Sequence, residues 1–388
     1  MYILRFILKN TFRHKLRTAL TIAGIAIAVM AFGFMRTIVE AWYAGVEASA
    51  ANRMITRQSV SFIFPLPLSY RNQIERVPGV SQVSYANWFG GVYKDVSDWN
   101  NFFPRFAIDP ETYFDLYPEF LVSPEELEAF RKERRACIVG AKLARQHQFR
   151  IGDIIPVEGD IYPGRWEFVV RGIYHGRDET IDETAMVFQW AYLNEQVRER
   201  QPGREGQVGW YVLKVDDPSK MSEVSKKVDD LFFNSRAGTK TETEKEFQQS
   251  FVSMSSAIIT SLKIVSFVVI GIILLVLANT MVMAARERTR EYAVLKTLGY
   301  SSKHLFTLIG GESMFIAIIG GFLGVAITFP VARAFARAFP TFFPVFNVEP
   351  LTITLSISAA LFAGVVAAVF PITRTLRATI VDGLRTLG

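Results

Sequence analysis

Four long apolar stretches constrain this chain more than any other feature of its sequence. They occupy residues 18–39, 264–285, 313–332 and 350–373, and charged residues are absent from them except at the end of the first. A helix needs about 20 mostly apolar residues to cross a bilayer, whereas the apolar runs of buried soluble helices usually reach only about 10–14. The sequence therefore predicts four transmembrane helices.

Residues 40–250, between the first two stretches, have the composition of an ordinary globular domain. Strand-like and helical patterns alternate in it, which predicts a mixed α/β fold. The expected strands are 59–64, 80–88, 154–157, 167–174, 209–215 and 239–243, and the expected helices are 69–76 and 218–234. Strand–helix–strand patterns at both ends indicate one subdomain interrupted by an inner one at about 104–205. We expect residues 242–262 to form a helical stalk that continues without a break into the second span.

Basic residues flank the apolar stretches asymmetrically. Lysine and arginine are concentrated before the first stretch, between the second and third, and after the fourth, whereas the short connector 333–349 holds only Arg333 and Arg337. Short loops rich in Lys and Arg remain on the cytoplasmic side, and long translocated domains do not affect this rule. We therefore expect both termini to be cytoplasmic and the large α/β domain to be extracytoplasmic, inserted between transmembrane helices one and two.

These observations predict the following order along the chain. The divisions are a cytoplasmic interfacial helix 1–17, transmembrane helix 1 at 18–39, the extracytoplasmic domain 40–250, a stalk with transmembrane helix 2 at 251–285, a cytoplasmic segment 286–312, transmembrane helix 3 at 313–332, an extracytoplasmic connector 333–349, transmembrane helix 4 at 350–373 and a cytoplasmic tail 374–388. In helix 3, Gly320, Gly321 and Gly324 are spaced to allow close helix packing in the membrane.

The cytoplasmic segment 286–312 is the most informative part of the sequence. Its residues predict a helix that ends near Gly299, and Ser301 or Ser302 can cap the next helix. Tyr292, Leu295 and Leu298 are spaced along one apolar edge of the first helix. A loop that only connected two spans would not need an amphipathic helix.

Residues 290–301, REYAVLKTLGYS, resemble an element of the MacB/FtsX-type ABC permeases, a family that includes macrolide exporters and lipoprotein-release permeases. In that family the element is the coupling helix that docks on an ATPase. The resemblance extends over nearly the whole chain, because the one-plus-three order of spans and a glutamate at the position of Glu312 also match. It implies that the residues in contact with the ATPase are Arg290, Glu291, Leu295, Lys296, Leu298 and Gly299.

The resemblance implies a permease subunit that couples ATP hydrolysis by a separate ABC ATP-binding subunit to motion of the extracytoplasmic domain. It would extract or export a hydrophobic or amphipathic substrate such as a lipoprotein, lipid, peptide or drug. The implied partners are that ATPase, a second permease in a homodimer or related heterodimer, membrane lipid, and a periplasmic adaptor or lipoprotein. ATP and Mg would be bound by the ATPase, with no cofactor on this chain. The implied location is the bacterial inner membrane.

Two other functions remain open at this stage. A regulator of the same architecture would move no substrate and would activate an extracytoplasmic partner such as a cell-wall hydrolase. A membrane-anchored enzyme or sensor would use the spans only as anchors, and the coupling element disfavours it. The chain has no GxxxxGK[ST] motif for an ATPase of its own and no catalytic or metal-ligand motif among its four histidines. The net charge of +6 comes without a nucleic-acid-binding motif, so nucleic acid is not an expected partner.

Three smaller features allow a functional and a structural interpretation. The acidic residues of 178–183 could bind a cation, but no ligand spacing accompanies them, which favours a solvated loop. The aromatic residues of 88–103 either line an apolar surface or fill a core. Cys137 lies between apolar neighbours and is expected to be buried.

Overall fold

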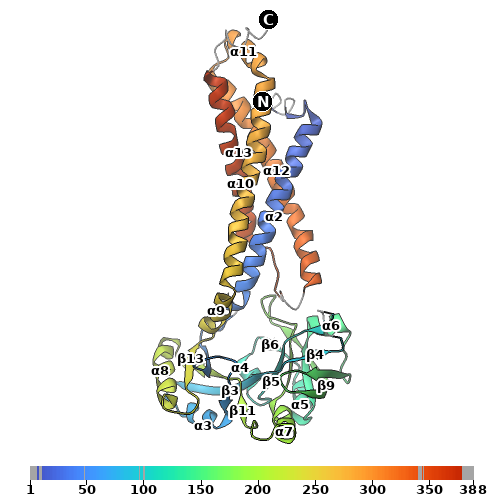
Figure 1. Cartoon of the computed structure of the whole chain (residues 1–388), viewed down its shortest axis with the longest axis vertical. Coiled ribbons are helices and arrows are strands. Elements are labelled where there is room, and N and C mark those ends of the chain that lie inside the picture. The colour runs from blue at the N-terminus through green and yellow to red at the C-terminus, as the bar shows by residue number, and fades with distance from the viewer. Residues whose placement is uncertain are drawn as a thin grey trace. The chain divides into compact units, whose positions relative to one another are not determined.

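The computed structural model describes residues 7, 11–47, 49–95, 97–98, 101–339, 343 and 345–377. The chain divides into two compact units (Figure 1). The helical unit comprises 1–41, 256–337 and 346–388, and the α/β unit comprises 42–255 and 338–345. Most of the expected interfacial helix 1–17 and all of the tail beyond residue 377 lie outside the described residues.

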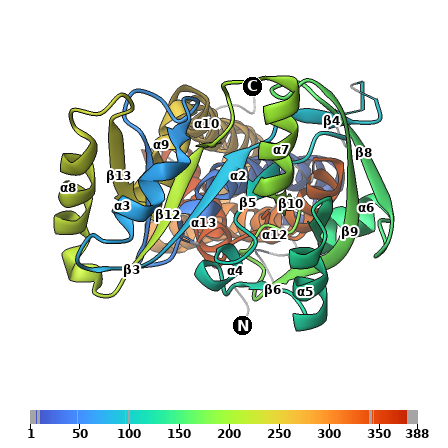
Figure 2. The ribbon, with the colours of Figure 1, turned by 90° about the horizontal axis from the view of Figure 1, so that it is seen from below.

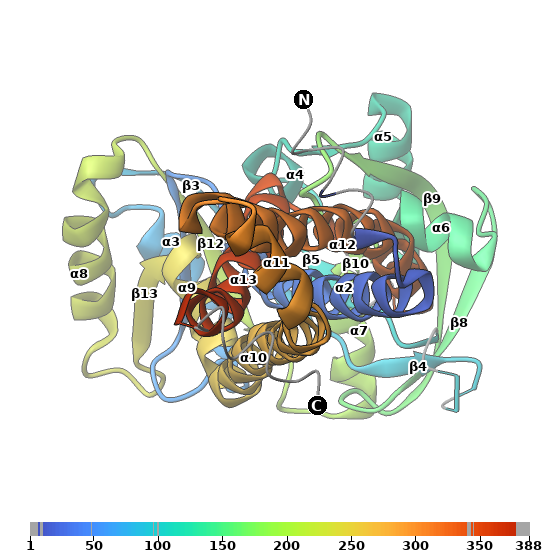
Figure 3. The same cartoon turned by 90° about the horizontal axis from the view of Figure 1, so that it is seen from above.

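Four long helices form the helical unit, side by side in Figure 3. They are α2 (Lys15–Glu47), α10 (Ser256–Glu287), α12 (Ser302–Ala338) and α13 (Pro350–Arg377). Each contains a segment long and apolar enough to cross a membrane, as predicted. The short helix α11 (Thr289–Thr297) connects α10 to α12.

Hydroxyl groups connect these helices at several levels. Thr21 of α2 and Thr280 of α10 share a hydrogen bond of 3.2 Å, and the Ser313 hydroxyl of α12 donates to the Gly364 carbonyl of α13 at 2.7 Å. At another level, the Thr352 hydroxyl of α13 donates to the Glu40 carboxylate of α2 at 2.6 Å. In lipid, where water does not compete, such side-chain bonds supplement close packing between helices.

A single 11-stranded sheet organises the α/β unit. Its strand order is β13-β1-β12-β3-β5-β10-β7-β9-β8-β4, with β6 paired to β9, and β11 and β2 form a separate pair. The strands are β1 (Arg53–Gln58), β2 (Leu66–Pro67), β3 (Val80–Trp88), β4 (Gly91–Tyr93), β5 (Arg105–Ile108), β6 (Phe120–Leu121), β7 (Ala136–Gly140), β8 (Ile154–Gly159), β9 (Gly164–Gly176), β10 (Met186–Gln189), β11 (Gln207–Val208), β12 (Trp210–Val215) and β13 (Thr239–Thr243). The pairs β5–β10 and β7–β9 are parallel, and the other pairs are antiparallel.

Helices pack on both faces of this sheet. They are α3 (Arg71–Ile74), α4 (Tyr113–Leu116), α5 (Pro124–Lys132), α6 (Ala141–His147), α7 (Trp190–Arg200), α8 (Met221–Phe232) and α9 (Glu244–Met254). Residues of α3, α6, α7 and α8 join the core on the first face, and residues of α4, α5 and α9 pack on the second. Figure 2 shows α8 beside β13 at one end of the sheet and α5 and α6 near β9 at the other. The inner segment 104–205 thus adds its strands to the same sheet as the outer segments.

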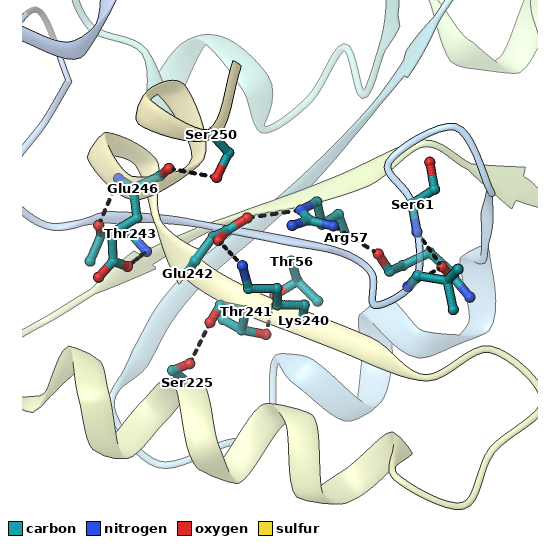
Figure 4. A network of polar contacts seen from close by, with 12 residues as sticks. Thr56, Arg57, Ser61, Ser225, Lys240, Thr241, Glu242, Thr243, Glu246 and Ser250 are labelled. Atoms are coloured by element: carbon teal, nitrogen blue, oxygen red, sulfur yellow. Dashed lines mark hydrogen bonds and ion pairs between the residues drawn. The ribbon is translucent and has the colours of Figure 1, made fainter. Parts of the chain in front are cut away.

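The strand expected at 59–64 is wrong. Strand β1 lies just before it, at Arg53–Gln58, and pairs with β12 on one side and β13 on the other. Side-chain contacts support this register, because Arg57 binds the Glu242 carboxylate at 2.8 Å and Lys240 binds it at 2.6 Å (Figure 4). The apolar run after β1 forms a turn in which Val60 and Ile63 are largely exposed.

The expected uninterrupted stalk is also wrong. Helix α9 begins at Glu244, two residues after the expected start, where Thr243 and Glu246 form a reciprocal capping box (Figure 4). It ends at Met254, and Ser255 has φ −94° and ψ 10°, which is outside the α-helical range. Helix α10 starts anew at Ser256, so two helices replace the single predicted one.

The aromatic residues of 88–103 divide between core and surface. Phe89, Tyr93 and Phe103 are buried, whereas Trp88 and Phe102 are exposed by 40% and 41%. Trp99 lies outside the described residues. Cys137 is fully buried on β7, as predicted.

Candidate functional site

The connection between α10 and α12 is a sharp elbow whose turn depends on a glycine. Gly299 has φ +88°, a conformation that costs side-chain-bearing residues about 1–2 kcal/mol. The Tyr300 N–H donates to the Leu295 carbonyl at 3.0 Å, and the Gly299 N–H donates to the Lys296 carbonyl at 3.1 Å. This pair of bonds is the Schellman motif, which satisfies the last carbonyls of a helix. Local sequence therefore determines where α11 ends.

Helix α11 has a buried face and an exposed face. Tyr292 and Ala293 are 3% and 5% exposed, and Leu295 is partly buried against the apolar core of the helical unit. Leu298 follows the end of α11 and is 71% exposed, so it does not share the buried edge of Tyr292. Val294 is also exposed, by 47%.

Exposed apolar side chains continue around the elbow. Tyr300 and Phe306 are 50% and 57% exposed, in addition to Val294 and Leu298. Apolar residues clustered on a charged loop mark interaction surfaces more often than isolated ones do. We call Val294, Leu298, Tyr300 and Phe306 the elbow surface.

A buried ion pair holds the elbow against α12. The Arg288 guanidinium contacts the Glu312 carboxylate at 2.9 Å, and each residue is 7% exposed. Arg288 also contacts Glu291 at 3.2 Å, and its guanidinium lies over the Tyr292 ring, 5.5 Å from the centroid. Burial opposes the charged form of Arg288, but the Tyr292 phenol and the carboxylates of Glu312 and Glu291 outweigh it and raise its pKa. The guanidinium therefore stays charged inside the protein.

Helix α2 joins this cluster through two further ion pairs. Arg13, just before α2, contacts Glu291, and Arg17 contacts Glu287 at the end of α10 through two hydrogen bonds of 2.6 and 2.7 Å. Desolvation works against ionised Glu291, but hydrogen bonds from Arg13 and Arg288 outweigh it and lower its pKa. Charges from three segments of the chain therefore meet at the elbow.

The structure places the six residues predicted to contact an ATPase on α11 and its closing turn. Arg290 and Leu298 are exposed, whereas Glu291, Leu295 and Lys296 are half-buried. The sequence does not single out Arg288, which is one of several basic residues of the segment 286–312. No local signal marks it, because its partner Glu312 lies 24 residues further along the chain.

The glycines of α12 face two different helices. A Cβ atom on Gly320 would lie 2.6 Å from Ile25 of α2, and one on Gly324 would lie 2.6 Å from Val29. A Cβ atom on Gly321 would lie 3.0 Å from Ala360 of α13. Gly320 and Gly324 thus allow α12 to approach α2, and Gly321 allows it to approach α13.

The acidic side chains of 178–183 accept hydrogen bonds from neighbouring residues. Asp178 accepts from Thr180, and Asp182 accepts from the backbone and hydroxyl of Thr184, both at 2.7 Å. Glu183 accepts from the Gly176 N–H at 2.9 Å. Among the described residues, no group of three or more His, Cys, Asp or Glu side chains has an arrangement that could hold a metal ion.

Comparison with known proteins identifies the family. The sequence model for the MacB-like periplasmic core domain matches residues 18–231, more than half of the chain. The model for the FtsX-like permease C-terminal domain matches residues 263–380, which include the elbow. The chain belongs to the MacB/FtsX-type ABC permease family.

A curated relative agrees with this assignment. The permease is 23% identical to an uncharacterized ABC transporter permease of Methanocaldococcus jannaschii over 355 residues, which cover 85% of this chain and 84% of the relative. Membership of this family implies an ATP-binding partner, and the four apolar helices indicate a multi-pass membrane protein.

Two solved structures are similar to part of the permease. One is the periplasmic region of MacB from Actinobacillus actinomycetemcomitans, with 12% identity and a TM-score of 0.39, covering 53% of this chain and 95% of that one. The other is the extracellular domain of the ABC-type transporter YknZ from Gram-positive bacteria, with 13% identity and a TM-score of 0.37, covering 50% of this chain and 100% of that one.

Proposed function

We propose that this permease couples ATP hydrolysis on a separate ATP-binding subunit to motion of its α/β unit, and thereby extracts or exports a hydrophobic or amphipathic substrate. The observation that carries the proposal is the elbow surface. Exposed apolar side chains there lie on α11, on the turn that closes it and on the start of α12, and a buried ion pair holds this connection. A rigid apolar surface of this kind suits docking into a groove on a partner protein, because little conformational entropy is lost on binding.

The proposed topology follows from the distribution of basic residues. The termini and the elbow would be cytoplasmic in a bacterial inner membrane, and the α/β unit would be the extracytoplasmic domain inserted between the first and second spans. The ATPase would bind ATP and Mg. Since such ATPases close as a pair, a second permease, identical or related, would complete the assembly, with membrane lipid around the spans and a periplasmic adaptor or lipoprotein as a further partner.

A substitution on the elbow surface tests ATPase docking. Leu298→Asp places a charge on a side chain that is 71% exposed, so the permease fold is expected to survive while the apolar contact is lost. Leu295→Asp would be a poorer choice, because Leu295 packs against the core. We expect co-purification of the cognate ATP-binding subunit, and its permease-dependent ATP hydrolysis, to fall at least tenfold, on the order of one desolvated hot-spot contact.

The matched control is Leu231→Asp in α8, which charges a leucine that is 50% exposed in the α/β unit. We expect it to leave binding and hydrolysis unchanged. If Leu298→Asp permease retains the ATPase as well as the wild type does, the elbow surface is not the docking site.

A regulator that activates an extracytoplasmic partner and moves no substrate is the second candidate. It requires an α/β unit that transmits motion, and Arg53 joins the start of β1 to the start of α9 through a buried contact with Glu244 at 2.9 Å. A rigid connection between β1 and α9 would transmit motion through the α/β unit whether or not a substrate is transported. Reconstituted transport of a labelled amphiphile, compared with ATP-dependent activation of a hydrolase, separates the two candidates.

A further inference from the structure

The α/β unit contains a cleft of about 880 Å³ with a mostly apolar and aromatic lining. Most of its lining comes from strands β1, β3, β5, β10 and β12, the turn after β1, and helices α4, α7 and α9, and strands β6, β9 and β11 and the connecting segments contribute the rest. Clefts of about 300–1,000 Å³ with apolar walls and a few polar groups are typical of small-molecule sites. This size fits a small molecule better than a folded protein partner.

Three aromatic side chains of the cleft share the second face of the sheet. Trp88 of β3 is paired with Phe106 of β5, and Trp210 of β12 is paired with Ala86, two residues from Trp88. Residues directly opposite, or two apart on one strand, lie on the same face. The rings of Trp88 and Phe106 are 5.2 Å apart, those of Phe106 and Trp210 are 5.9 Å apart, and both pairs are edge to face.

More aromatic residues extend the lining from the turn after β1 and from α9. Phe62 lies 4.9 Å from Phe251, and Phe251 lies 5.0 Å from Phe247, measured between ring centroids. Phe251 is 39% exposed and Trp88 is 40% exposed, although both line the cleft. Large aromatic surface is therefore available to a ligand without unfolding the core.

The tryptophans of the unit differ in their hydrogen bonds. The indole N–H groups of Trp166 and Trp190 donate to backbone carbonyls at 2.9 and 3.1 Å. The indole rings of Trp88 and Trp210, by contrast, contact other rings, but their N–H groups donate no hydrogen bond to any residue that the structure describes. Indole N–H groups usually have a partner once they are covered. A molecule that covered these two rings would need an acceptor oxygen.

The two carboxylates of the lining are engaged, whereas its guanidinium, that of Arg204, is exposed. Glu244 accepts from Arg53 at 2.9 Å and from the Ala50 N–H at 3.0 Å, and Arg204 donates to Gln201 at 2.8 Å. Asp182, the other charged lining residue, is bonded within its own turn to Thr184. An anionic ligand would meet two carboxylates beside the single guanidinium of Arg204, and a cationic ligand would have to compete with Arg53 for Glu244. An uncharged ligand avoids both costs.

We propose that this cleft binds an uncharged amphiphile, with its apolar body against Trp88, Phe106 and Trp210 and an acceptor oxygen on an indole N–H. The proposal deepens the proposed function by naming a class of transported or sensed molecule. Binding itself requires neither the ATPase nor nucleotide. Its outcome is therefore separate from that of the elbow-docking experiment.

The test uses the full chain in lipid nanodiscs and two naphthalene probes. Prodan is uncharged and has a ketone oxygen, whereas 1-anilinonaphthalene-8-sulfonate is anionic. Fluorescence titrations are corrected with empty nanodiscs at the same lipid concentration. We expect saturable Prodan binding to the wild type, binding at least tenfold weaker to Trp88→Ala/Trp210→Ala, and sulfonate binding at least tenfold weaker than Prodan binding.

Two further variants control for folding and for nonspecific binding of the probe outside the cleft. Trp88→Phe/Trp210→Phe keeps the ring packing and removes only the N–H donors, and we expect it to weaken Prodan binding about threefold to fivefold at an unchanged melting temperature. Phe233→Ala removes an aromatic that is 81% exposed and not part of the lining, and we expect no change. Wild-type signal equal to empty nanodiscs, equal binding of both probes, or wild-type affinity in the two double variants would overturn the proposal.

Discussion

At the scale of single residues, the Arg288–Glu312 pair is the most consequential contact of the elbow. It is buried, it spans 24 residues of sequence, and Glu291 shares the same guanidinium. Burying two charges has a high desolvation cost, so the pair contributes less to net stability than its short distance suggests. Its clearer consequence is positional, because it fixes the start of α11 against α12.

Removing one member of this pair is expected to be strongly destabilising. Arg288→Met leaves the Glu312 carboxylate buried without a partner, which typically costs about 3–5 kcal/mol. We expect a lower midpoint in denaturation by SDS, followed by intrinsic fluorescence. The double variant Arg288→Met/Glu312→Leu removes both charges and should recover most of the loss. A single variant as stable as the wild type would show that the pair is not formed.

At the scale of helices, glycine position decides how closely the spans approach. Gly324 faces α2 with no room for a side chain, because a Cβ atom would lie 2.7 Å from the Ala26 carbonyl oxygen. Gly271 of α10 has no neighbouring atom within 4 Å of such a Cβ position, apart from its own helix. Two glycines within apolar helices thus differ in what surrounds them, although their sequence contexts look alike.

This difference predicts opposite effects of the same substitution. Gly324→Ala should destabilise the helical unit by about 1–3 kcal/mol, because α2 and α12 must move apart. Gly271→Ala should be neutral or stabilising by up to about 1 kcal/mol, since alanine has the higher helix propensity. Thermal stability in detergent, measured by size-exclusion chromatography after heating, checks both. Equal losses in the two variants would contradict the packing described for Gly324.

At the scale of the whole molecule, Arg53 joins the segments where the chain enters and leaves the α/β unit. This residue at the start of β1 is 4% exposed and contacts Glu119 at 2.6 Å and Glu244 at 2.9 Å. Burial works against its charged form, but Tyr117, Glu119 and Glu244 together raise its pKa. The segments where the chain enters and leaves the unit are therefore held together by one buried cation.

Substitution of Arg53 is expected to loosen the α/β unit without affecting docking of the ATPase at the elbow. Arg53→Met leaves two buried carboxylates without a counterion, so amides of β1 and α9 should exchange with deuterium at least tenfold faster. Exchange in α11 and co-purification of the ATPase should not change, because the elbow retains its own contacts. Unchanged exchange in α9 would show that Arg53 does not hold this segment, and loss of the ATPase would contradict the independence of the elbow.

Much of this architecture was readable from local sequence patterns. The four spans follow from long apolar stretches, and the end of α11 follows from Gly299, since a helix can close there only with a positive φ. The mixed α/β character and the capped start of α9 also depend on residues close together in the chain. Such features are determined by periodicity and turn chemistry over a few residues, and the sequence is sufficient for them.

Only the tertiary structure decided the features that join distant residues. The partner of Arg288, the helix that each glycine faces, and the shift of β1 to Arg53–Gln58 depend on segments 24 to almost 300 residues apart. The division of neighbouring aromatics into a core around Phe89 and a cleft at Trp88 depends on which face of the sheet each one occupies. Several strand positions, helix faces and ion-pair partners look equally suitable in the local sequence. Strand pairing and burial select among them, because the free energy that decides comes from contacts between distant residues, which no short stretch of the chain contains.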